Sequence, residues 1–456
     1  MSPRNPPAFA PVDSLHPDCP DWEQMGPTRA DGAVRAMAEV NDRHEAERQR
    51  AWSRGFSRRR LLAGGLGVGV AGLASQVVTT RVAYADPTEA TSSLVVVFLR
   101  GGMDGLSMLV PADDPAYLAA RPDVALRASQ LLAFGRGFGL HPALAPLKPL
   151  IDAGSFAAVP AISTPHLTRS HVQAQDCLER GGFSGSSLRT GWLDRLLEQI
   201  GTGTTFRSLA AGNAAPRSLL GANHPLVVRE LATFDLTGTG STHEASLTAL
   251  RKLYTGIDHP FAEQSLVALA AADQARAIDQ AEPEPSARGY EDTTVNKALA
   301  SVASLIRQGA GMRVATVDVG GWDMHTQMGR AGEGDFHDLT ASLARALATF
   351  TRDLGDKLSN TTVVVMSEFG RRVEQNGSAG TDHGHGGLAL VLGGGVTGGV
   401  HGNWEGLGSL DRGDVPGSND YRDLLGEVIM KRFGLSPAQA AQVFPDWSVT
   451  APGVMR

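Results

Sequence analysis

The chain has 456 residues, of which 42% are hydrophobic and 20% are charged. Its 41 basic and 48 acidic side chains give a formal net charge of −7. It has no positive excess that could follow a phosphate backbone, which argues against a nucleic-acid-binding protein.

The first 85 residues differ in composition from the rest of the chain. Residues 1–54 are rich in Pro, Asp, Glu and Arg, and we expect them to form a disordered extension. Residues 55–85 combine three arginines at 58–60, a glycine-diluted apolar stretch at 61–78 and the small-x-small sequence at 83–85. This order predicts a twin-arginine signal peptide, with a membrane anchor as the alternative that the glycines disfavour.

Cleavage after residue 85 would define a mature chain outside the cytoplasm, with no stable membrane insertion. Removal of the 11 basic and 9 acidic residues of this segment would leave a net charge of −9. Cys19 would be lost and Cys177 would remain alone, so we expect no internal disulfide. The sequence leaves open the oligomeric state and whether residues 1–54 are translated.

Strands and helices alternate along the remainder, 86–456. Predicted strands lie at 94–99, 155–161, 312–319, 360–366 and 388–392, and predicted helices at 171–178, 295–306, 336–358 and 421–433. This alternation predicts an α/β fold with a mostly parallel central sheet and helices on both faces. The segment at about 200–290 is less regular, and we interpret it as a helical and loop insertion.

Side chains of metal-ligand type follow three of the predicted strands, where functional residues of such sheets gather. Asp104 lies in a glycine-rich turn, Asp323 and His325 follow a double glycine, and Glu368 follows the strand at 360–366. Carboxylates and imidazoles are ligands of zinc and manganese. The alternatives are a turn-forming Asp104, a capping Asp323 with an unrelated His325, and an ion pair of Glu368.

The strongest local signal is the glycine-flanked sequence GTDHGHGG, which holds Asp382, His383 and His385. Three potential ligands within four residues indicate a divalent cation site for zinc, manganese or calcium. The alternative is a hydrogen-bonded structural turn.

A nucleophile candidate precedes the helix predicted at 171–178. Ser170, or Thr168, would cap this helix, whose N-terminus favours a hydroxylate or a bound phosphate, and a nearby metal would lower the pKa of the hydroxyl. Both residues are also ordinary N-cap types. Arg169 and Arg371 are candidates for steadying an anionic substrate.

Five stretches identify the chain as a member of a bacterial exported family catalogued as domain of unknown function 1501: FLRGGMDGLSMLVP, TRSHVQAQD, GWLDRLL, GGWDMHTQ and SEFGRRVEQNGSAGTDHGHGG. This family resembles, more distantly, the alkaline phosphatase and sulfatase superfamily, which transfers phosphoryl or sulfuryl groups with metal ions and a Ser, Thr or formylglycine nucleophile. The resemblance implies one alkaline-phosphatase-like domain over 86–456. No Pro-x-Arg pattern follows Cys177, so formylglycine is not expected.

The resemblance also implies roles for several of these residues. Asp104 corresponds to the metal-ligating Asp of the first strand, and Ser170, or less well Thr168, to the nucleophile. Asp323 and His325 correspond to the Asp and His of one metal site, although they lie closer together in sequence than is usual.

The match is incomplete at the strand that ends near residue 366. Glu368 and Phe369 stand where the superfamily has an Asp-His pair. Asp382-His383 would supply the missing histidine and leave His385 as the downstream ligand. These departures leave open a single metal, a different metal or a lapsed site.

These features together lead to two hypotheses. The first is an exported metal-dependent hydrolase that cleaves a small anionic ester, or a glycan-linked one, of phosphate or sulfate. The second is a non-catalytic accessory protein of the envelope or of polysaccharide assembly that retains the fold.

Overall fold

The computed structural model describes residues 92–456 apart from 184–185, 224, 236–242, 257–259 and 331. These residues belong to one compact unit. The predicted extension (1–54) and the predicted signal peptide (55–85) lie outside the described residues, and the start of the domain at residue 86 stays a prediction. None of the helices in the described part of the chain is long and apolar enough to span a membrane.

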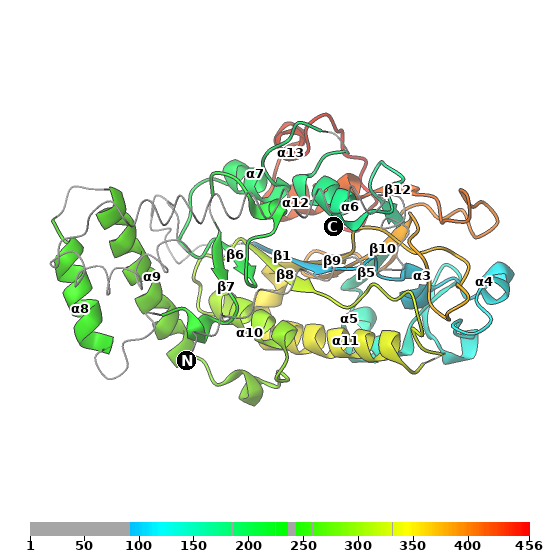
Figure 1. The fold of residues 1–456 in the computed structure, drawn as a ribbon, viewed down its shortest axis with the longest axis horizontal. Coiled ribbons are helices and arrows are strands. Elements are labelled where there is room, and N and C mark those ends of the chain that lie inside the picture. Colours follow the sequence, from blue (N-terminus) through cyan, green and yellow to red (C-terminus); the bar gives the residue numbers. More distant parts are fainter. Residues whose placement is uncertain (1–91, 184–185, 224, 236–242, 257–259, 331) are drawn as a thin grey trace, which may run out of the picture. The chain divides into compact units, whose positions relative to one another are not determined.

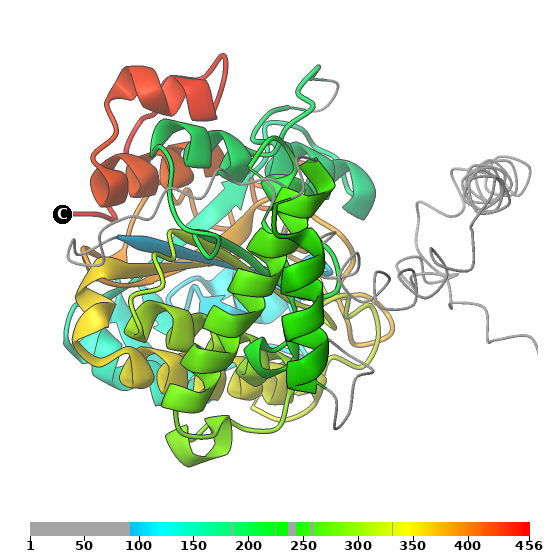
Figure 2. The same ribbon diagram turned by 90° about the vertical axis from the view of Figure 1, so that its left-hand side faces the viewer.

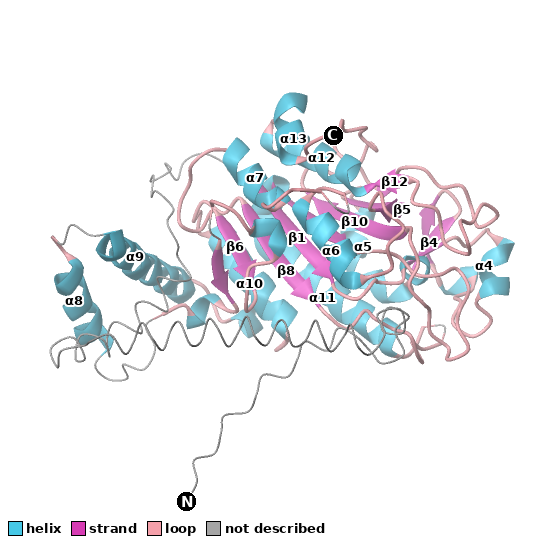
Figure 3. Ribbon diagram, turned by 45° about the horizontal axis from the view of Figure 1, so that its top comes forward, coloured by secondary structure: helices cyan, strands magenta, loops and turns pink. Residues whose placement is uncertain are grey.

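A nine-stranded sheet forms the centre of the described part, with the order β11-β5-β10-β9-β1-β8-β6-β7 and with β12 beside β5 (Figure 3). The strands are β1 (Ser93–Leu99), β5 (Phe156–Ser163), β6 (Ser208–Ala211), β7 (Leu226–Val228), β8 (Val314–Val319), β9 (Thr361–Met366), β10 (Gly387–Gly393), β11 (Gly399–Val400) and β12 (Asn419–Asp420). β10 is antiparallel to β5 and β9, whereas the other pairs in this sheet are parallel.

The strand β1 shows why the sheet is buried on both faces. Successive side chains of a strand point to opposite sides. Val95 and Val97 therefore belong to one hydrophobic core, and Leu94 and Val96 belong to the other. A continuous apolar, β-branched strand is typical of a sheet that is covered on both faces.

Helices cover both faces, as Figure 1 shows, which confirms the predicted fold class. The first core is covered by α5 (Lys148–Asp152), α10 (Thr294–Arg307) and α11 (Asp335–Leu354), and the second by α6 (His171–Arg180), α7 (Trp192–Gln199), α12 (Tyr421–Phe433) and α13 (Pro437–Val443). The sheet thus separates two helical layers, and its strand ends carry the loops that form the candidate site.

The segment predicted as an insertion at about 200–290 has two parts. It contains the helices α8 (His243–Tyr254) and α9 (Pro260–Ala281), which lie side by side in Figure 2. It also contains β6 and β7, which extend the central sheet at one edge. These strands have only four and three residues, too few for a recognisable alternating pattern, and the sequence prediction of an insertion without sheet strands was wrong at this point.

Smaller elements surround the sheet. The strands β2 (Leu109–Val110), β3 (Leu132–Gly135) and β4 (Phe138–Leu140) form a second, antiparallel sheet, and α3 (Gly105–Met108) and α4 (Pro115–Ala120) are short helices. The 3-10 helices are η1 (Ala128–Gln130), η2 (Pro142–Leu147), η3 (Arg217–Leu219), η4 (Leu231–Thr233), η6 (Pro285–Arg288) and η7 (Gly355–Asn360).

The turn after β1 is held by a buried ion pair between Asp104 and Arg121. Arg121 is fully buried and donates from Nη1 to Oδ1 of Asp104 at 2.9 Å and from Nε to the carbonyl of Val373 at 2.8 Å. Asp104 also caps α3 by accepting from the Ser107 N–H, and it accepts from the Thr381 hydroxyl at 3.0 Å. The oxygens of Asp104 thus accept hydrogen bonds from Arg121, Ser107 and Thr381. This structural role differs from the metal-ligand role that the sequence predicts.

This ion pair makes a testable contribution to stability. Asp104→Ala leaves the Arg121 guanidinium buried without its counter-ion, and we expect the free energy of unfolding to fall by about 3–5 kcal/mol in urea titration. The control is Asp152→Ala, which removes an exposed pair with Lys148 and costs less than about 1 kcal/mol. Equal effects of the two substitutions would contradict a structural role for the buried pair.

Candidate metal centre

Three loops bring polar side chains to one edge of the central sheet. Asp323 and His325 follow the end of β8, and His171 begins α6 after the loop that leaves β5. His383 precedes β10, which runs antiparallel to its neighbours, so the start of β10 lies at the edge where the other strands end. This topology explains why ligand-type residues far apart in sequence meet here.

Asp323 is the centre of this cluster, which consists of Asp323, His171, His325 and His383. The Nε2 atoms of His325 and His383 each lie 3.1 Å from Oδ1 of Asp323, and they lie 3.0 Å from each other. The Nε2 atom of His171 lies 3.4 Å from Oδ2 of Asp323. Three imidazoles therefore present the same ring atom to one carboxylate.

The second ring nitrogen of each imidazole, Nδ1, contacts an oxygen atom on the side away from Asp323. The Nδ1 atoms face oxygen acceptors: His171 faces Glu368 at 2.8 Å, His325 faces Asp382 at 3.2 Å, and His383 faces the carbonyl of Arg169 at 2.9 Å. These acceptors favour the tautomer with its proton on Nδ1, which leaves a lone pair on Nε2. Carboxylates and carbonyls in this position are characteristic of metal-ligating histidines.

The Nε2 atom of His171 gives independent evidence for a missing ligand partner. The side chain is 6% exposed, and this buried atom forms no hydrogen bond among the described residues beyond its 3.4 Å approach to Asp323. A buried polar atom without a partner is costly, and such atoms in folded proteins are usually satisfied by protein, water or an ion.

The donor set fits a divalent transition metal. Metal–ligand bonds of about 2.0–2.1 Å in a tetrahedral site put neighbouring ligand atoms about 3.3 Å apart. Oδ1 of Asp323 and the Nε2 atoms of His325 and His383 lie 3.0 to 3.1 Å apart, and His171 Nε2 lies 3.4 Å from Oδ2 of Asp323. One ligand atom each of His171, Asp323 and His383 lies within 4.8 Å of the others. Imidazole nitrogens with one carboxylate suit zinc or manganese, whereas calcium prefers a cage of oxygen atoms. Of the three metals that the sequence suggests, calcium therefore fits least well.

The ionisable groups of the cluster shift one another's pKa values. Burial alone would raise the pKa of Asp323, but the three imidazoles and Arg371 lower it far below its ordinary range. Burial lowers the pKa of His171, but its contacts with Asp323 and Glu368 outweigh this and raise it to about 9. Burial likewise opposes ionisation of Glu368, yet its contacts with His171 hold its pKa at about 2. Both carboxylates thus stay ionised, with Arg371 and a protonated His171 as their positive partners. His171 would have to release a proton before its Nε2 could ligate a metal.

Glu368 and Asp382 lie behind the cluster and do not face its centre. Glu368 is 1% exposed and accepts hydrogen bonds from the Gly101 N–H at 3.0 Å and from Gln175 at 2.8 Å in addition to its contact with His171. Its position indicates that it orients an imidazole, which differs from the ligand role that the sequence predicts.

Arg371 is buried, and its guanidinium connects several loops by hydrogen bonds, so it is not free to bind a substrate. Its side chain is 1% exposed, and its guanidinium donates to Oδ1 of Asp323 at 2.6 Å and to the Thr381 carbonyl at 2.7 Å. It also donates to the carbonyls of Gly101, Gly102 and Trp322. Every nitrogen of the guanidinium is engaged in this way, so the geometry does not support the anion-binding role predicted for it.

His385 is not part of the cluster, although it lies two residues from His383. It is buried, and its electrostatic neighbours are Asp414, Asp411 and Arg169. Burial lowers its pKa. Arg169 itself donates to Oδ2 of Asp414 at 2.6 Å, and its side chain is 41% exposed.

The nucleophile candidates lie beside the cluster. Ser170 is the N-cap of α6, directly before His171, and its hydroxyl makes no capping hydrogen bond. The hydroxyl of Thr168 donates to Oε1 of Gln173 at 2.9 Å and accepts from the Ser170 N–H at 3.2 Å. Thr168 is therefore engaged in local structure, whereas the Ser170 hydroxyl has no such partner.

His171 is the member of the cluster that the sequence analysis missed. Its only signal was its place directly after Ser170 at the start of a predicted helix. More than 150 residues separate it from Asp323, so no spacing rule connects the two.

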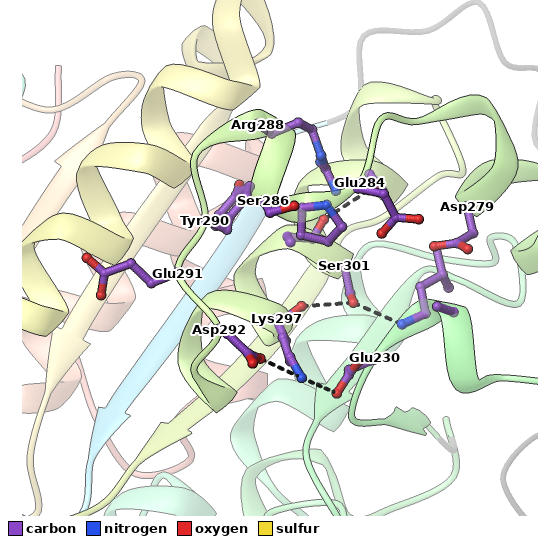
Figure 4. Close-up of a pocket in the computed structure, with 15 residues that line it drawn as sticks. Glu230, Asp279, Glu284, Ser286, Arg288, Tyr290, Glu291, Asp292, Lys297 and Ser301 are labelled. Atoms are coloured by element: carbon purple, nitrogen blue, oxygen red, sulfur yellow. Dashed lines mark hydrogen bonds and ion pairs between the residues drawn. The ribbon is translucent and has the colours of Figure 1, made fainter.

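A cavity of about 450 Å³ lies elsewhere, between α9 and α10 (Figure 4). Its lining includes Glu230, Asp279, Glu284 and Asp292, and Lys297 forms ion pairs with Glu230 and Asp292. It shares no residue with the cluster, and its carboxylates alone do not define a ligand.

Comparison with known proteins identifies a family but no activity. Residues 158–429 match the model of the family described as "Protein of unknown function (DUF1501)". No curated protein matches the sequence.

Among solved structures, the C-terminal periplasmic domain of EcEptC from Escherichia coli, in complex with Zn, is 11% identical, with a TM-score of 0.31 and coverage of 68% of this chain and 74% of that one. A protein in the alkaline phosphatase superfamily from Vibrio parahaemolyticus is 13% identical, with a TM-score of 0.32 and coverage of 73% and 70%. PsFucS1 sulfatase from Pseudoalteromonas sp. is 11% identical, with a TM-score of 0.34 and coverage of 86% and 76%. Similarity at this level does not indicate the activity of this chain.

The cluster predicts which histidines hold the metal. We expect about one zinc or manganese ion per chain by elemental analysis after dialysis, and its loss in His171→Ala and in His383→Ala, because each removes an Nε2 ligand. The matched control is His385→Ala, which removes a buried histidine from the same loop and retains the ion. Retention in His171→Ala together with loss in His385→Ala would contradict this assignment.

The position of Glu368 predicts an indirect effect on metal binding. Glu368→Gln keeps the shape but weakens the acceptor for the His171 Nδ1–H, and we expect metal affinity to fall about 10–100-fold in competition titrations with a chelator. Gln175→Ala removes only a donor to Glu368 and should have a smaller effect. A complete loss of metal in Glu368→Gln would instead indicate that Glu368 is itself a ligand.

Proposed function

Because the chain belongs to the family described as "Protein of unknown function (DUF1501)", whose description states no activity, we propose a function from the site itself. We propose that the protein is a metal-dependent hydrolase of phosphate or sulfate esters with Ser170 as its nucleophile. The observation that carries this proposal is the convergence of three imidazoles on Asp323, one of them from His171, which follows Ser170 directly in the chain.

The metal would be held by His171, His383 and Asp323, which each place one ligand atom within 4.8 Å of the others, and His325 lies beside them at 3.1 Å from Asp323. Bound there, a divalent ion supplies Lewis-acid polarisation of an ester oxygen and a lower pKa for a nearby hydroxyl. Glu368, Asp382 and the Arg169 carbonyl keep the imidazoles in the ligating tautomer.

The start of α6 provides a second source of positive potential for an anionic ester. The Ala174 N–H is bonded to the Ser170 carbonyl, so the N–H groups of the first turn before it have no intrahelical acceptor. Such free groups and the helix dipole favour phosphate or sulfate at this position. The partly exposed guanidinium of Arg169 adds a further positive charge next to Ser170.

Hydrolysis would proceed in two displacement steps. In the first step, Oγ of Ser170 forms a bond to phosphorus or sulfur, the bond to the alcohol oxygen breaks, and the alcohol leaves with the proton that Ser170 gives up. In the second step, water attacks the same atom, the bond to Oγ breaks, and phosphate or sulfate leaves as the serine hydroxyl is restored.

The location and the substrate class are part of the same proposal. The predicted twin-arginine signal would carry the chain out of the cytoplasm, where a small anionic ester or a glycan-linked one would be its substrate. The acidic balance of the chain gives no reason to expect nucleic acid as a partner.

The two hydroxyls near the helix start allow a matched test of the nucleophile. With zinc or manganese bound, we expect turnover of p-nitrophenyl phosphate or p-nitrophenyl sulfate, and a drop of at least roughly 10³-fold in kcat for Ser170→Ala with the metal retained. Thr168→Ala is the control and should stay within about tenfold of the wild type, because that hydroxyl serves local structure.

Two outcomes would contradict parts of the proposal. Full turnover by Ser170→Ala would exclude this serine as the nucleophile. A metal-loaded wild-type protein that hydrolyses neither class of ester would favour the accessory, non-catalytic alternative.

A further inference from the structure

Exposed apolar side chains gather around the start of α6. Seven large apolar side chains in the described part of the chain are exposed: Leu118, Leu167, Val172, Phe183, Leu220, Leu253 and Leu410. Three of them, Leu167, Val172 and Phe183, lie on α6 or on the segments next to it, and we call these three the apolar rim. Single exposed apolar residues are ordinary on protein surfaces, whereas a group beside a candidate site indicates a binding surface.

Two contacts join the members of the apolar rim. The hydrogen bond from Thr168 to Gln173 ties the loop that carries Leu167 to the first turn of α6, which carries Val172. The ring of His166 lies 6.2 Å from the ring of Phe183, so the same loop also reaches the segment after α6. The segments that carry the three side chains are therefore linked to one another.

Two residues of the apolar rim lie close in sequence to Ser170, and the cluster around Asp323 is partly accessible to solvent. Leu167 precedes Ser170 by three residues and Val172 follows it by two, and they are 48% and 56% exposed. The Asp323 side chain is 28% exposed, so the centre is open to solvent. An ester that placed its anionic group at Ser170 would have its alcohol group one oxygen atom away, against the residues that flank this serine.

We propose that the apolar rim binds the apolar alcohol group of an amphiphilic phosphate or sulfate ester, such as a long alkyl ester. This inference rests on the proposed function and adds the substrate class to it. The anionic head is attracted to the metal and to the free N–H groups of α6, and the alkyl chain covers side chains that otherwise face water. A polar sugar or a short alcohol gains nothing from these three residues.

Chain-length dependence tests this inference. We expect kcat/KM of the metal-loaded protein to rise about twofold per methylene from methyl to octyl phosphate or sulfate, below the roughly fourfold of complete burial, because the rim covers one side of the chain. In the double variant Leu167→Ser/Val172→Ser the ratio of octyl to methyl kcat/KM should fall at least about tenfold. The matched control is Leu253→Ser, a leucine that is 45% exposed on α8, and it should keep the wild-type ratio.

A binding measurement separates failure of this inference from failure of the proposed function. Titration calorimetry of octyl sulfate and methyl sulfate with metal-loaded Ser170→Ala needs no turnover, and we expect tighter binding of the octyl compound that Leu167→Ser/Val172→Ser removes. Equal affinities for the two sulfates would overturn the inference even if the protein is a hydrolase. Sedimentation that shows a dimer weakened by the double variant, without any chain-length effect, would also overturn it, because a second copy of the chain would then cover the rim.

Discussion

The Asp323 side chain is 28% exposed, and a partly buried carboxylate needs hydrogen-bond donors or cations nearby. Three imidazoles and the Arg371 guanidinium meet this requirement. His171 follows β5, His325 follows β8, and Arg371 and His383 both lie in the connection between β9 and β10. Arg371 also donates to backbone carbonyls after β1 and after β8, so the same group that neutralises the carboxylate fixes the turns that carry it. The geometry of the cluster and the conformation of these turns therefore depend on one set of charges.

Close backbone packing makes this arrangement possible, and it explains the glycines of the loop before β10. Arg371 and His383 form an isolated antiparallel bridge. A Cβ atom on Gly370 would lie 2.1 Å from the Gly386 carbonyl oxygen, and one on Gly384 would lie 2.4 Å from the Arg371 carbonyl carbon. Any larger residue at these positions would push the two segments apart, and His383 would lose its place against Asp323.

The sequence predicts the strands and helices that surround this site better than it predicts which side chains face the centre of the cluster. Continuous apolar runs identify β1, β8 and β9, and the start of α12 at Tyr421 agrees with the prediction, because periodicity is a local property. The prediction also finds Asp323, His325 and His383, which follow strand ends, but it cannot decide which side chains face inward. Glu368 and Asp382 have the chemistry of ligands, yet they bond to the outer nitrogens of His171 and His325. His171 could not be connected to the others, because only the path of the chain through the sheet brings it there.

The supporting residues bear on how many ions the proposed site could hold. A second ion would need carboxylates, but Asp104 is bound to Arg121 and Glu368 accepts from the Gly101 N–H, His171 and Gln175. Phe369 stands where the superfamily resemblance implies a histidine, and its ring packs 4.9 Å and 4.8 Å from those of His171 and His383. It therefore fixes the orientation of two imidazoles without adding a ligand atom. The described residues offer one set of inward donors, so under the proposed function one metal ion and the N-terminus of α6 would neutralise the charge of a bound ester.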